Sequence, residues 1–180
     1  MPCEVRAIAR GDGRFDIDTA AGPVSAPSLV IATGGLTVPK IGATPFGYKV
    51  AEQFGLAIVP PRPALVPLSF DPATLARYGD LSGVAVDAEV SCRRARFREN
   101  LLFTHRGLSG PAILQVSSYW QDGPAADPIH VNLLPGRDAR AWLAEHRRAK
   151  VHLATLLAER IPKRLAQAWC EVHGFAGPMA

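Results

Sequence analysis

The sequence predicts an α+β fold, on three observations. Polar and apolar residues alternate on both sides of Gly11-Asp12-Gly13, which is the pattern of a β-hairpin around a tight turn. Residues 29–32 form a continuous apolar run without alternation, which is typical of a strand buried on both faces of a parallel sheet. After residue 136 the composition shifts to Ala, Leu, Arg, Glu and Lys, which favours helices.

Residues 1–60 are expected to form a first part of the fold. The hairpin strands fall at residues 4–10 and 14–18, and a third short strand follows near Val24. The buried strand at residues 29–32 comes next. Residues 47–55 have the apolar spacing of a short helix, and Gly55 suits its C-terminal cap.

Residues 61–136 are expected to be rich in β-structure. Four prolines between residues 60 and 67 exclude a helix there and mark a boundary. Pro111 is suited to the first position of a helix that runs to about Trp120. The expected strands lie at residues 65–70, 84–92, 95–104 and 129–134.

Residues 137–180 are expected to form helices at 138–147, 150–160 and 162–172. The formal net charge of +4 comes from this stretch, which has eight Lys or Arg and four Asp or Glu. A basic helical stretch suits contact with nucleic acid or another anion. A solvated helix face is the more ordinary explanation of the same charges.

The bulk composition excludes several classes of protein. With 48% hydrophobic and 20% charged residues in 180, the chain has the balance of a globular protein. The three cysteines lie far apart without a C-x-x-C pair, so neither a disulfide framework nor a zinc site is indicated. No apolar run approaches the length of a membrane span, so a cytoplasmic protein without a membrane partner is expected.

The first candidate site is the run Ala32-Thr33-Gly34-Gly35, at the end of the apolar run. Glycine has no Cβ, so a backbone or a flat ligand can approach closely. The carboxyl ends of parallel strands are where doubly wound sheets bind nucleotides. On these residues alone, a simple turn is the alternative.

The second candidate is the loop from Gly42 through Thr44 to Gly47, just before the expected helix. Backbone N–H groups at a helix N-terminus attract anions and electron-rich carbonyls. Thr44 can cap the helix or donate to a ligand. A capping loop without a ligand explains the pattern equally well.

The third candidate is the loop from Phe103 to Pro111, which contains His105 and Ser109. These groups could hold a carboxylate or polarise a carbonyl, or the loop could be structural. The loop lacks the G-x-S-x-G spacing of a hydrolase elbow. The sequence has no G-x-G-x-x-G in a strand–helix context and no P-loop, and its five histidines lack metal-ligand spacing.

Together these motifs resemble the YhiN-like (BaiN-like) family of FAD-dependent flavoproteins. The resemblance is carried most specifically by A-T-G-G with the Gly42-Ala43-Thr44 loop and by F-T-H-x-G-L-S-G-P at residues 103–111. It implies an internal fragment of a longer oxidoreductase. Residues 1–60 would be part of a Rossmann-like FAD-binding domain, residues 61–136 a β-barrel-like insert domain, and residues 137–180 a helical segment.

The resemblance also implies site residues. FAD would lie against the residues Ala32, Thr33, Gly34, Gly35, Gly42, Thr44 and Gly47. His105 and Ser109 would face the substrate, and no catalytic residue or metal is assigned. FAD would pass a hydride to an unknown small organic substrate. Because the G-x-G-x-x-G fingerprint is absent, the chain alone is expected to bind FAD weakly or not at all and to lack activity.

The partner expected from this resemblance is a small molecule, and nucleic acid is not expected. Apolar surface left open by missing parts could drive self-association. The alternative interpretation is a stand-alone binding module whose basic C-terminal helices contact nucleic acid or a partner protein. Aromatic residues make up only 7% of the chain and form no stacking stripe, which counts against that alternative.

Overall fold

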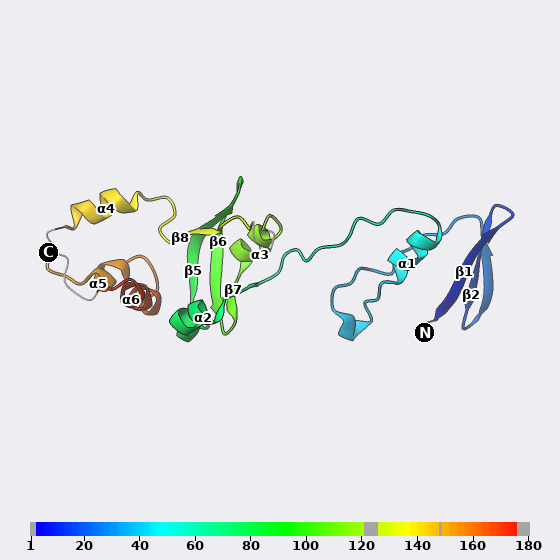
Figure 1. Cartoon of the computed structure of the whole chain (residues 1–180), viewed down its shortest axis with the longest axis horizontal. Coiled ribbons are helices and arrows are strands. Elements are labelled where there is room, and N and C mark those ends of the chain that lie inside the picture. The colour runs from blue at the N-terminus through cyan, green and yellow to red at the C-terminus, as the bar shows by residue number, and fades with distance from the viewer. Residues whose placement is uncertain (1–2, 121–125, 148, 176–180) are drawn as a thin grey trace. The chain divides into compact units, whose positions relative to one another are not determined.

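The computed structural model describes residues 3–120, 126–147 and 149–175. The chain folds as two compact units, residues 1–61 (unit 1) and residues 62–180 (unit 2). Both contain strands and helices, as Figure 1 shows, so the α+β class predicted from the sequence is confirmed. None of the helices in the described ranges is long and apolar enough to cross a membrane.

Unit 1 is built on a three-stranded antiparallel sheet in the order β1-β2-β3. Asp12 and Gly13 form the first turn with φ angles of 47° and 75°, which are left-handed values that Asp and Gly tolerate better than most residues. The predicted hairpin and third strand are therefore confirmed. The strands are β1 (Val5–Gly11), β2 (Arg14–Thr19) and β3 (Gly22–Ala26).

Helix α1 (Phe46–Gln53) contacts this sheet, and it confirms the helix predicted at residues 47–55. Ile8 of β1 and Val50 of α1 are buried. The Gln53 side chain donates a hydrogen bond from Nε2 to the Ile8 carbonyl oxygen at 2.6 Å. These contacts give unit 1 a small core. A short 3-10 helix, η1 (Pro39–Ile41), precedes α1.

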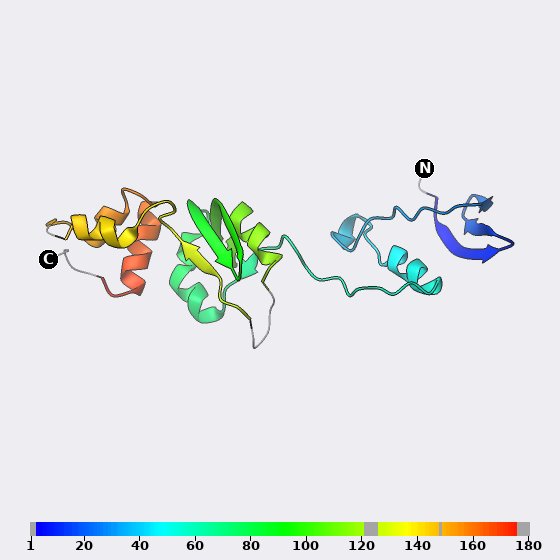
Figure 2. The ribbon, with the colours of Figure 1, turned by 90° about the horizontal axis from the view of Figure 1, so that it is seen from above.

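Unit 2 contains a five-stranded antiparallel sheet in the order β4-β7-β6-β5-β8. Its longest ladder pairs β5 with β6, from Ala85 opposite Leu102 to Cys92 opposite Ala95. Figure 2 shows this curved sheet from above. The strands are β4 (Leu68–Ser69), β5 (Ala85–Cys92), β6 (Ala95–Thr104), β7 (Gly107–Ser109) and β8 (His130–Asn132). The sheet fits the barrel-like domain expected here, as a half-barrel.

The first part of unit 2 departs from the prediction. Residues 65–70 were expected to form a strand, but only β4 pairs, and α2 (Pro72–Tyr78) with the 3-10 helix η2 (Gly79–Leu81) follows at once. The Asp71 carboxylate caps α2 by accepting the Ala73 amide at 2.9 Å and the Thr74 amide at 3.1 Å. Asp71-Pro72 is a helix-start signal that the apolar alternation around it obscured.

The remaining helices are confirmed but are shorter than predicted. Helix α3 packs on β5 and β6, and α5 packs against α6. The helices are α3 (Pro111–Ser117), α4 (Ala139–Glu145), α5 (Leu153–Leu157) and α6 (Lys163–Val172).

A single hydrophobic cluster joins the sheet of unit 2 to its helices. Alternate residues of β5 and β6 enter this core, as their alternating burial shows. The largest fully buried side chains of the cluster are Leu101, Ile113, Leu165, Val90, Val116 and Cys92. The C-terminal helices therefore share a core with the half-barrel.

Candidate functional site

The Gly-rich segment of unit 1, residues 29–35, is mostly exposed and does not form a strand. The strand predicted at residues 29–32, with Ala32-Thr33-Gly34-Gly35 at its end, is therefore wrong for this structure. A strand needs a hydrogen-bonded neighbour, and β1, β2 and β3 pair only with one another. Val30 is 85% exposed, so the middle of the apolar run has no cover within the described part of unit 1.

The structure does bring part of this segment to the start of α1. A Cβ added at Gly47 would lie 3.1 Å from Thr33 Oγ1 and 3.2 Å from Ile31 Cγ2. Gly47 thus allows the segment to pack tightly on the first turn of the helix. Two of the predicted site positions, Thr33 and Gly47, are direct neighbours.

The loop before α1 is organised by local hydrogen bonds. Gly42 closes η1 by donating its amide to the Pro39 carbonyl at 3.1 Å, with a φ of 99°. The Thr44 hydroxyl oxygen accepts the Phe46 amide at 3.4 Å. This is a local hydrogen bond in the loop, because the N-cap of α1 is Pro45 and no side chain caps the helix, so the prediction that Thr44 caps the helix is not confirmed.

A flavin can lie against the predicted glycines only if there is open space next to their backbone. Cβ atoms added at Gly34, Gly35 or Gly42 would meet no atom within 4 Å. The backbone is open to a flat ligand, and Gly34 has a φ of 73° that disfavours other residues. These glycines leave room for such a ligand on one side, but the described residues around them do not enclose a flavin site.

The loop at residues 103–111 connects β6 through β7 to α3. The Thr104 hydroxyl oxygen accepts the amides of Arg106 and Gly107, both at 3.2 Å. A Cβ at Gly107 would collide with the Leu68 carbonyl oxygen of β4. The conspicuous Thr and Gly of this motif therefore serve the architecture of the half-barrel.

Gly110 has a similar structural function. A Cβ there would lie 2.6 Å from the Asn100 carbonyl oxygen, which belongs to β6. His105 is exposed in the β6–β7 turn, and Ser109 is half-buried at the other end of β7, opposite Leu102. The structure thus separates these two predicted substrate-side residues by the length of a strand.

A cleft in unit 2 has a volume of about 1140 Å³. It lies between the two edge strands of the half-barrel, because its walls include Leu68 of β4 and Val131 of β8. Trp120 and Phe70 give it aromatic surface, and Arg62 gives it a positive charge. The cleft can accept a planar group of mixed polarity.

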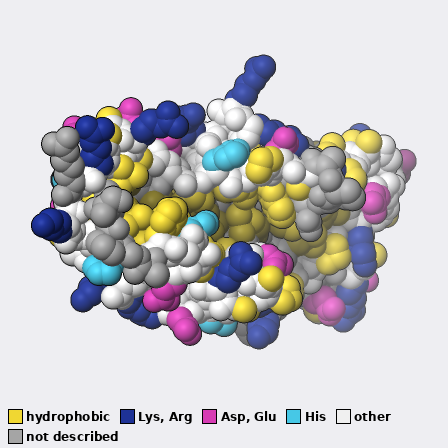
Figure 3. All heavy atoms as spheres, turned by 60° about the vertical axis from the view of Figure 1, so that its left-hand side comes forward, with side chains coloured by type: hydrophobic (Ala, Val, Ile, Leu, Met, Phe, Trp, Pro, Cys, Tyr) yellow, Lys and Arg dark blue, Asp and Glu magenta, His cyan; other side chains and the backbone are white. Residues whose placement is uncertain are grey.

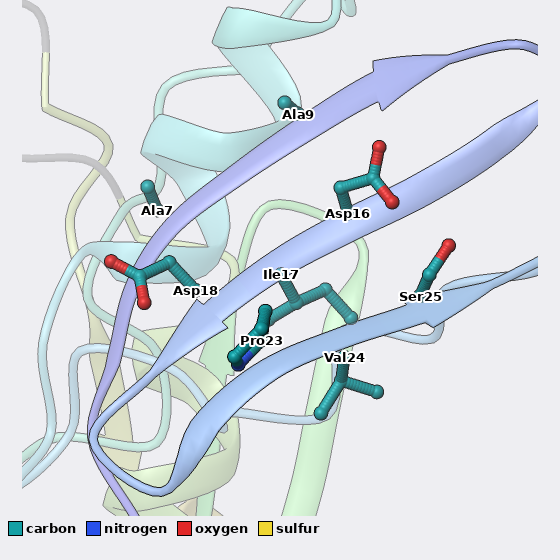
Figure 4. Close-up of a pocket in the computed structure, with 8 residues that line it drawn as sticks. All are labelled: Ala7, Ala9, Asp16, Ile17, Asp18, Pro23, Val24 and Ser25. Carbon is teal, nitrogen blue, oxygen red and sulfur yellow. The ribbon is translucent and has the colours of Figure 1, made fainter.

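A second concavity, of about 490 Å³, lies over the sheet of unit 1. Figure 4 shows that the carboxylates of Asp16 and Asp18 lie beside Ala7 and Ala9 there. Two neighbouring carboxylates repel anions. This surface is therefore unsuited to a phosphate group or a nucleic acid.

Sequence reasoning missed a concentration of arginines on the β5–β6 hairpin, at residues 93, 94, 96 and 98. Arg98 Nη2 lies 2.9 Å from Asp87 Oδ2, and this hydrogen bond raises the pKa of Arg98 above its ordinary value. The hydrogen bond that Arg93 donates to the Asp127 carboxylate likewise raises the pKa of Arg93. These cations are permanently charged and exposed.

The C-terminal helices carry further positive charge. Figure 3 shows Lys and Arg side chains, interspersed with Asp, Glu and His, around a face that also exposes hydrophobic side chains. Arg164 of α6 donates to the Asp80 carbonyl oxygen of η2, which ties the helix to the half-barrel. Across residues 3–120, 126–147 and 149–175, no group of three His, Cys, Asp or Glu side chains could hold a metal ion.

An antiparallel half-barrel followed by a pair of packed helices defines unit 2 as a barrel-and-helix module. Residues 62–179 match the family described as the HI0933-like protein barrel and H2TH domain. Because this match covers more than half of the 180 residues, the chain belongs to the HI0933-like family. The resemblance predicted from the sequence is thereby confirmed at the level of the family, but not as an FAD-dependent oxidoreductase of the BaiN type.

Two curated relatives are similar over nearly the whole chain, and both are named ribosomal RNA dihydrouridine synthase. The protein of Escherichia coli (strain K12) is 47% identical over 167 residues, which are 91% of this chain and 41% of that protein. The protein of Haemophilus influenzae (strain ATCC 51907 / DSM 11121 / KW20 / Rd) is 38% identical over 162 residues, which are 88% of this chain and 39% of that protein. The chain spans about two fifths of the length of these relatives.

These names correct two predictions. The function predicted from the sequence was hydride transfer to an unknown small organic substrate, whereas both relatives are named for a reaction on ribosomal RNA. The expectation that nucleic acid is not a partner is wrong for the same reason. The alternative that gave the chain a nucleic-acid contact agrees better with the relatives.

Proposed function

We propose that this chain is part of an enzyme that reduces uridine to dihydrouridine in ribosomal RNA. One observation carries the proposal: two relatives with that name align with about nine tenths of the chain, including both units. An identity of 47% over 167 residues extends well beyond what a shared fold requires.

The chemistry of the proposed reaction agrees with the family resemblance. Dihydrouridine forms when the C5–C6 double bond of uracil receives a hydride and a proton. Protein side chains do not donate hydride, so such an enzyme uses a redox cofactor. Bound FAD, in its reduced form, would supply the hydride.

The residues proposed to lie along FAD are Ala32, Thr33, Gly34, Gly35, Gly42, Thr44 and Gly47. Their contribution would be positional. The open backbone at Gly34 and Gly42 allows close approach, and the packing of Thr33 on Gly47 holds the segment against α1. No catalytic acid is assigned, and His105 and Ser109 stay candidates for the substrate side.

Unit 2 is proposed to contribute contacts to RNA. Residues 62–180 contain fifteen Lys or Arg and eleven Asp or Glu, so this unit carries the positive charge of the chain. Lys and Arg neutralise phosphates and release condensed counterions, which gives most of the sequence-independent affinity for nucleic acid. The exposed arginines of the hairpin and the basic helices both offer such contacts.

Deleting the coding sequence in its own cell tests the proposal. Ribosomal RNA is then digested to nucleosides, and dihydrouridine is measured by mass spectrometry. The proposal predicts that the dihydrouridine content of ribosomal RNA falls and that transfer RNA keeps its dihydrouridine. An unchanged content in ribosomal RNA contradicts it.

A further inference from the structure

A concave surface of about 600 Å³ lies at the tip of the β5–β6 hairpin. It belongs entirely to unit 2 and combines cationic with aromatic side chains. Its walls are Arg93, Arg94, Ala95, Arg96, Phe97 and Tyr119. These six residues form the hairpin tip.

Three arginines meet here because of the hairpin geometry. Arg93 and Arg94 form the turn between Cys92 and Ala95, and Arg96 follows with a side chain that is 67% exposed. Arg93 has a φ of 54°, a left-handed value that arginine seldom adopts. The tight turn therefore concentrates positive charge at one end of the sheet.

Neighbouring carboxylates only partly neutralise this charge. Arg93 pairs with Asp127, and Arg96 Nη1 lies 3.0 Å from Glu89 Oε1. A guanidinium has five N–H donors, so each of these arginines retains donors for another anion. Arg94 is exposed and has no ion-pair partner within the ranges that the structure describes.

An aromatic ring lies beside the arginines. Tyr119 follows α3, and its ring centroid is 5.7 Å from that of Phe97 at an interplanar angle of 42°. The Tyr119 amide donates to the Val116 carbonyl at 2.9 Å, which holds the residue at the end of the helix. Half of the Tyr119 side chain is still exposed.

We infer that the hairpin tip binds a single-stranded stretch of RNA, with its guanidinium groups on backbone phosphates and the Tyr119 ring against an unpaired base. This inference rests on the proposed function and specifies where its RNA binds. Basic side chains with an exposed aromatic ring are the combination that recognises single strands, because the ring stacks on a base that is not already stacked. An acidic peptide would use the arginines but would gain little from the ring.

The test uses the full 180-residue chain and fluorescence anisotropy. The probes are a labelled uridine-rich single strand of RNA and an RNA duplex of the same length. Tyr119→Leu removes the aromatic face while keeping apolar contact with Phe97, and Tyr119→Phe keeps the face. Arg94→Gln removes one cation from the tip, whereas Arg77→Gln removes an exposed cation from α2 and is the control for net charge.

We expect Tyr119→Leu to weaken single-strand binding about tenfold, within the range measured for loss of one stacked base, and Tyr119→Phe to bind like wild type. Arg94→Gln should lower the slope of log affinity against log salt by about 0.7, and Arg77→Gln should leave it unchanged. Thermal unfolding of each variant checks that the fold is intact.

The possible failures are distinguishable. Wild-type chain that binds no RNA at low salt contradicts both the proposed function and the hairpin tip. If the wild-type chain binds RNA and the Tyr119→Leu and Arg94→Gln variants bind it equally well, the proposed function stands but the hairpin tip is not the RNA-binding site. If polyglutamate displaces the RNA and Tyr119→Leu does not change RNA affinity, the inference about the hairpin tip is also overturned. That result indicates an acidic protein partner.

Discussion

The Ser117 hydroxyl oxygen accepts the backbone amide of Val66 at 3.0 Å and so joins α3 to the segment that leads into β4. The same hydroxyl donates to the Leu114 carbonyl at 2.8 Å, and Ser117 is only 4% exposed. A buried serine with both bonds made links two walls of the half-barrel cleft. Removing the Ser117 hydroxyl would leave the Val66 amide without its hydrogen-bond acceptor.

Ser117→Ala is therefore expected to lower the free energy of unfolding by about 1–2 kcal/mol. Urea denaturation followed by circular dichroism measures the change. Ser118→Ala, at the exposed neighbouring position, is the control and should change stability by less than about 0.5 kcal/mol. Equal stability of the two variants would show that the Val66 bond does not stabilise unit 2.

Gly107→Ala is expected to be far more damaging. The added methyl group would collide with the Leu68 carbonyl and would lie 2.8 Å from the Phe70 amide nitrogen. Because backbone atoms of β4 would have to move, we expect a loss of at least about 3 kcal/mol. In Gly83→Ala the added methyl group would meet no atom within 4 Å. The expected loss of stability is about 1 kcal/mol, because alanine is strained at the φ of 87° of this position. Thermal melts of both variants test the difference.

The cap of α2 gives a prediction about pH. The Thr74 hydroxyl, with backbone amides, holds the pKa of the Asp71 carboxyl below its ordinary value of 3.8. A lowered pKa in the folded state means that the stabilisation is fully present above the unfolded pKa and is lost as pH falls through the folded one.

Asp71→Ala should therefore lower the melting temperature at pH 7, and its difference from wild type should narrow as pH falls below about 4. Thermal melts from pH 7 to pH 2.5 measure this. Asp18→Ala removes an exposed carboxylate of β2 that caps no helix, and it controls for net charge. A difference that stays constant down to the lowest pH would contradict the explanation of the cap.

Flavin binding gives a fourth prediction. Under the proposed function, this chain would contribute only one side of a flavin site, next to Gly34 and Gly42, where an added Cβ would meet no atom within 4 Å. We expect the purified chain to release FAD on gel filtration and to show no stoichiometric visible absorbance. Tight stoichiometric binding would mean that the described residues do enclose a complete flavin site.

Local patterns in the sequence predicted much of the fold. The hairpin around Asp12-Gly13, the long strands β5 and β6, and α3 after Pro111 all follow from alternation or from a proline at a helix start. Such elements depend on neighbours close in sequence. The run at residues 29–32 was mispredicted because a strand also needs a distant partner.

The candidate sites were less predictable. Gly107 and Gly110 of the F-T-H motif matched a family pattern. Their structural role, which is to allow the backbones of β4 and β6 to come close, is visible only in the folded chain. Counting charges by region placed the positive excess at residues 137–180. The arginines of the hairpin were balanced in that count by acidic residues of the same region, including Asp87 and Glu89 on β5, and Tyr119 lies beside these arginines only after folding.

The central claim is most directly tested by restoring the reaction. A strain that lacks the coding sequence is supplied with the complete reading frame, either as wild type or with Gly47→Val, which would press on Thr33. Dihydrouridine in ribosomal RNA is then measured by mass spectrometry. We predict that wild type restores the modification and that Gly47→Val restores much less of it at equal protein abundance. Ribosomal RNA with the same dihydrouridine content in the deleted and restored strains would contradict the claim.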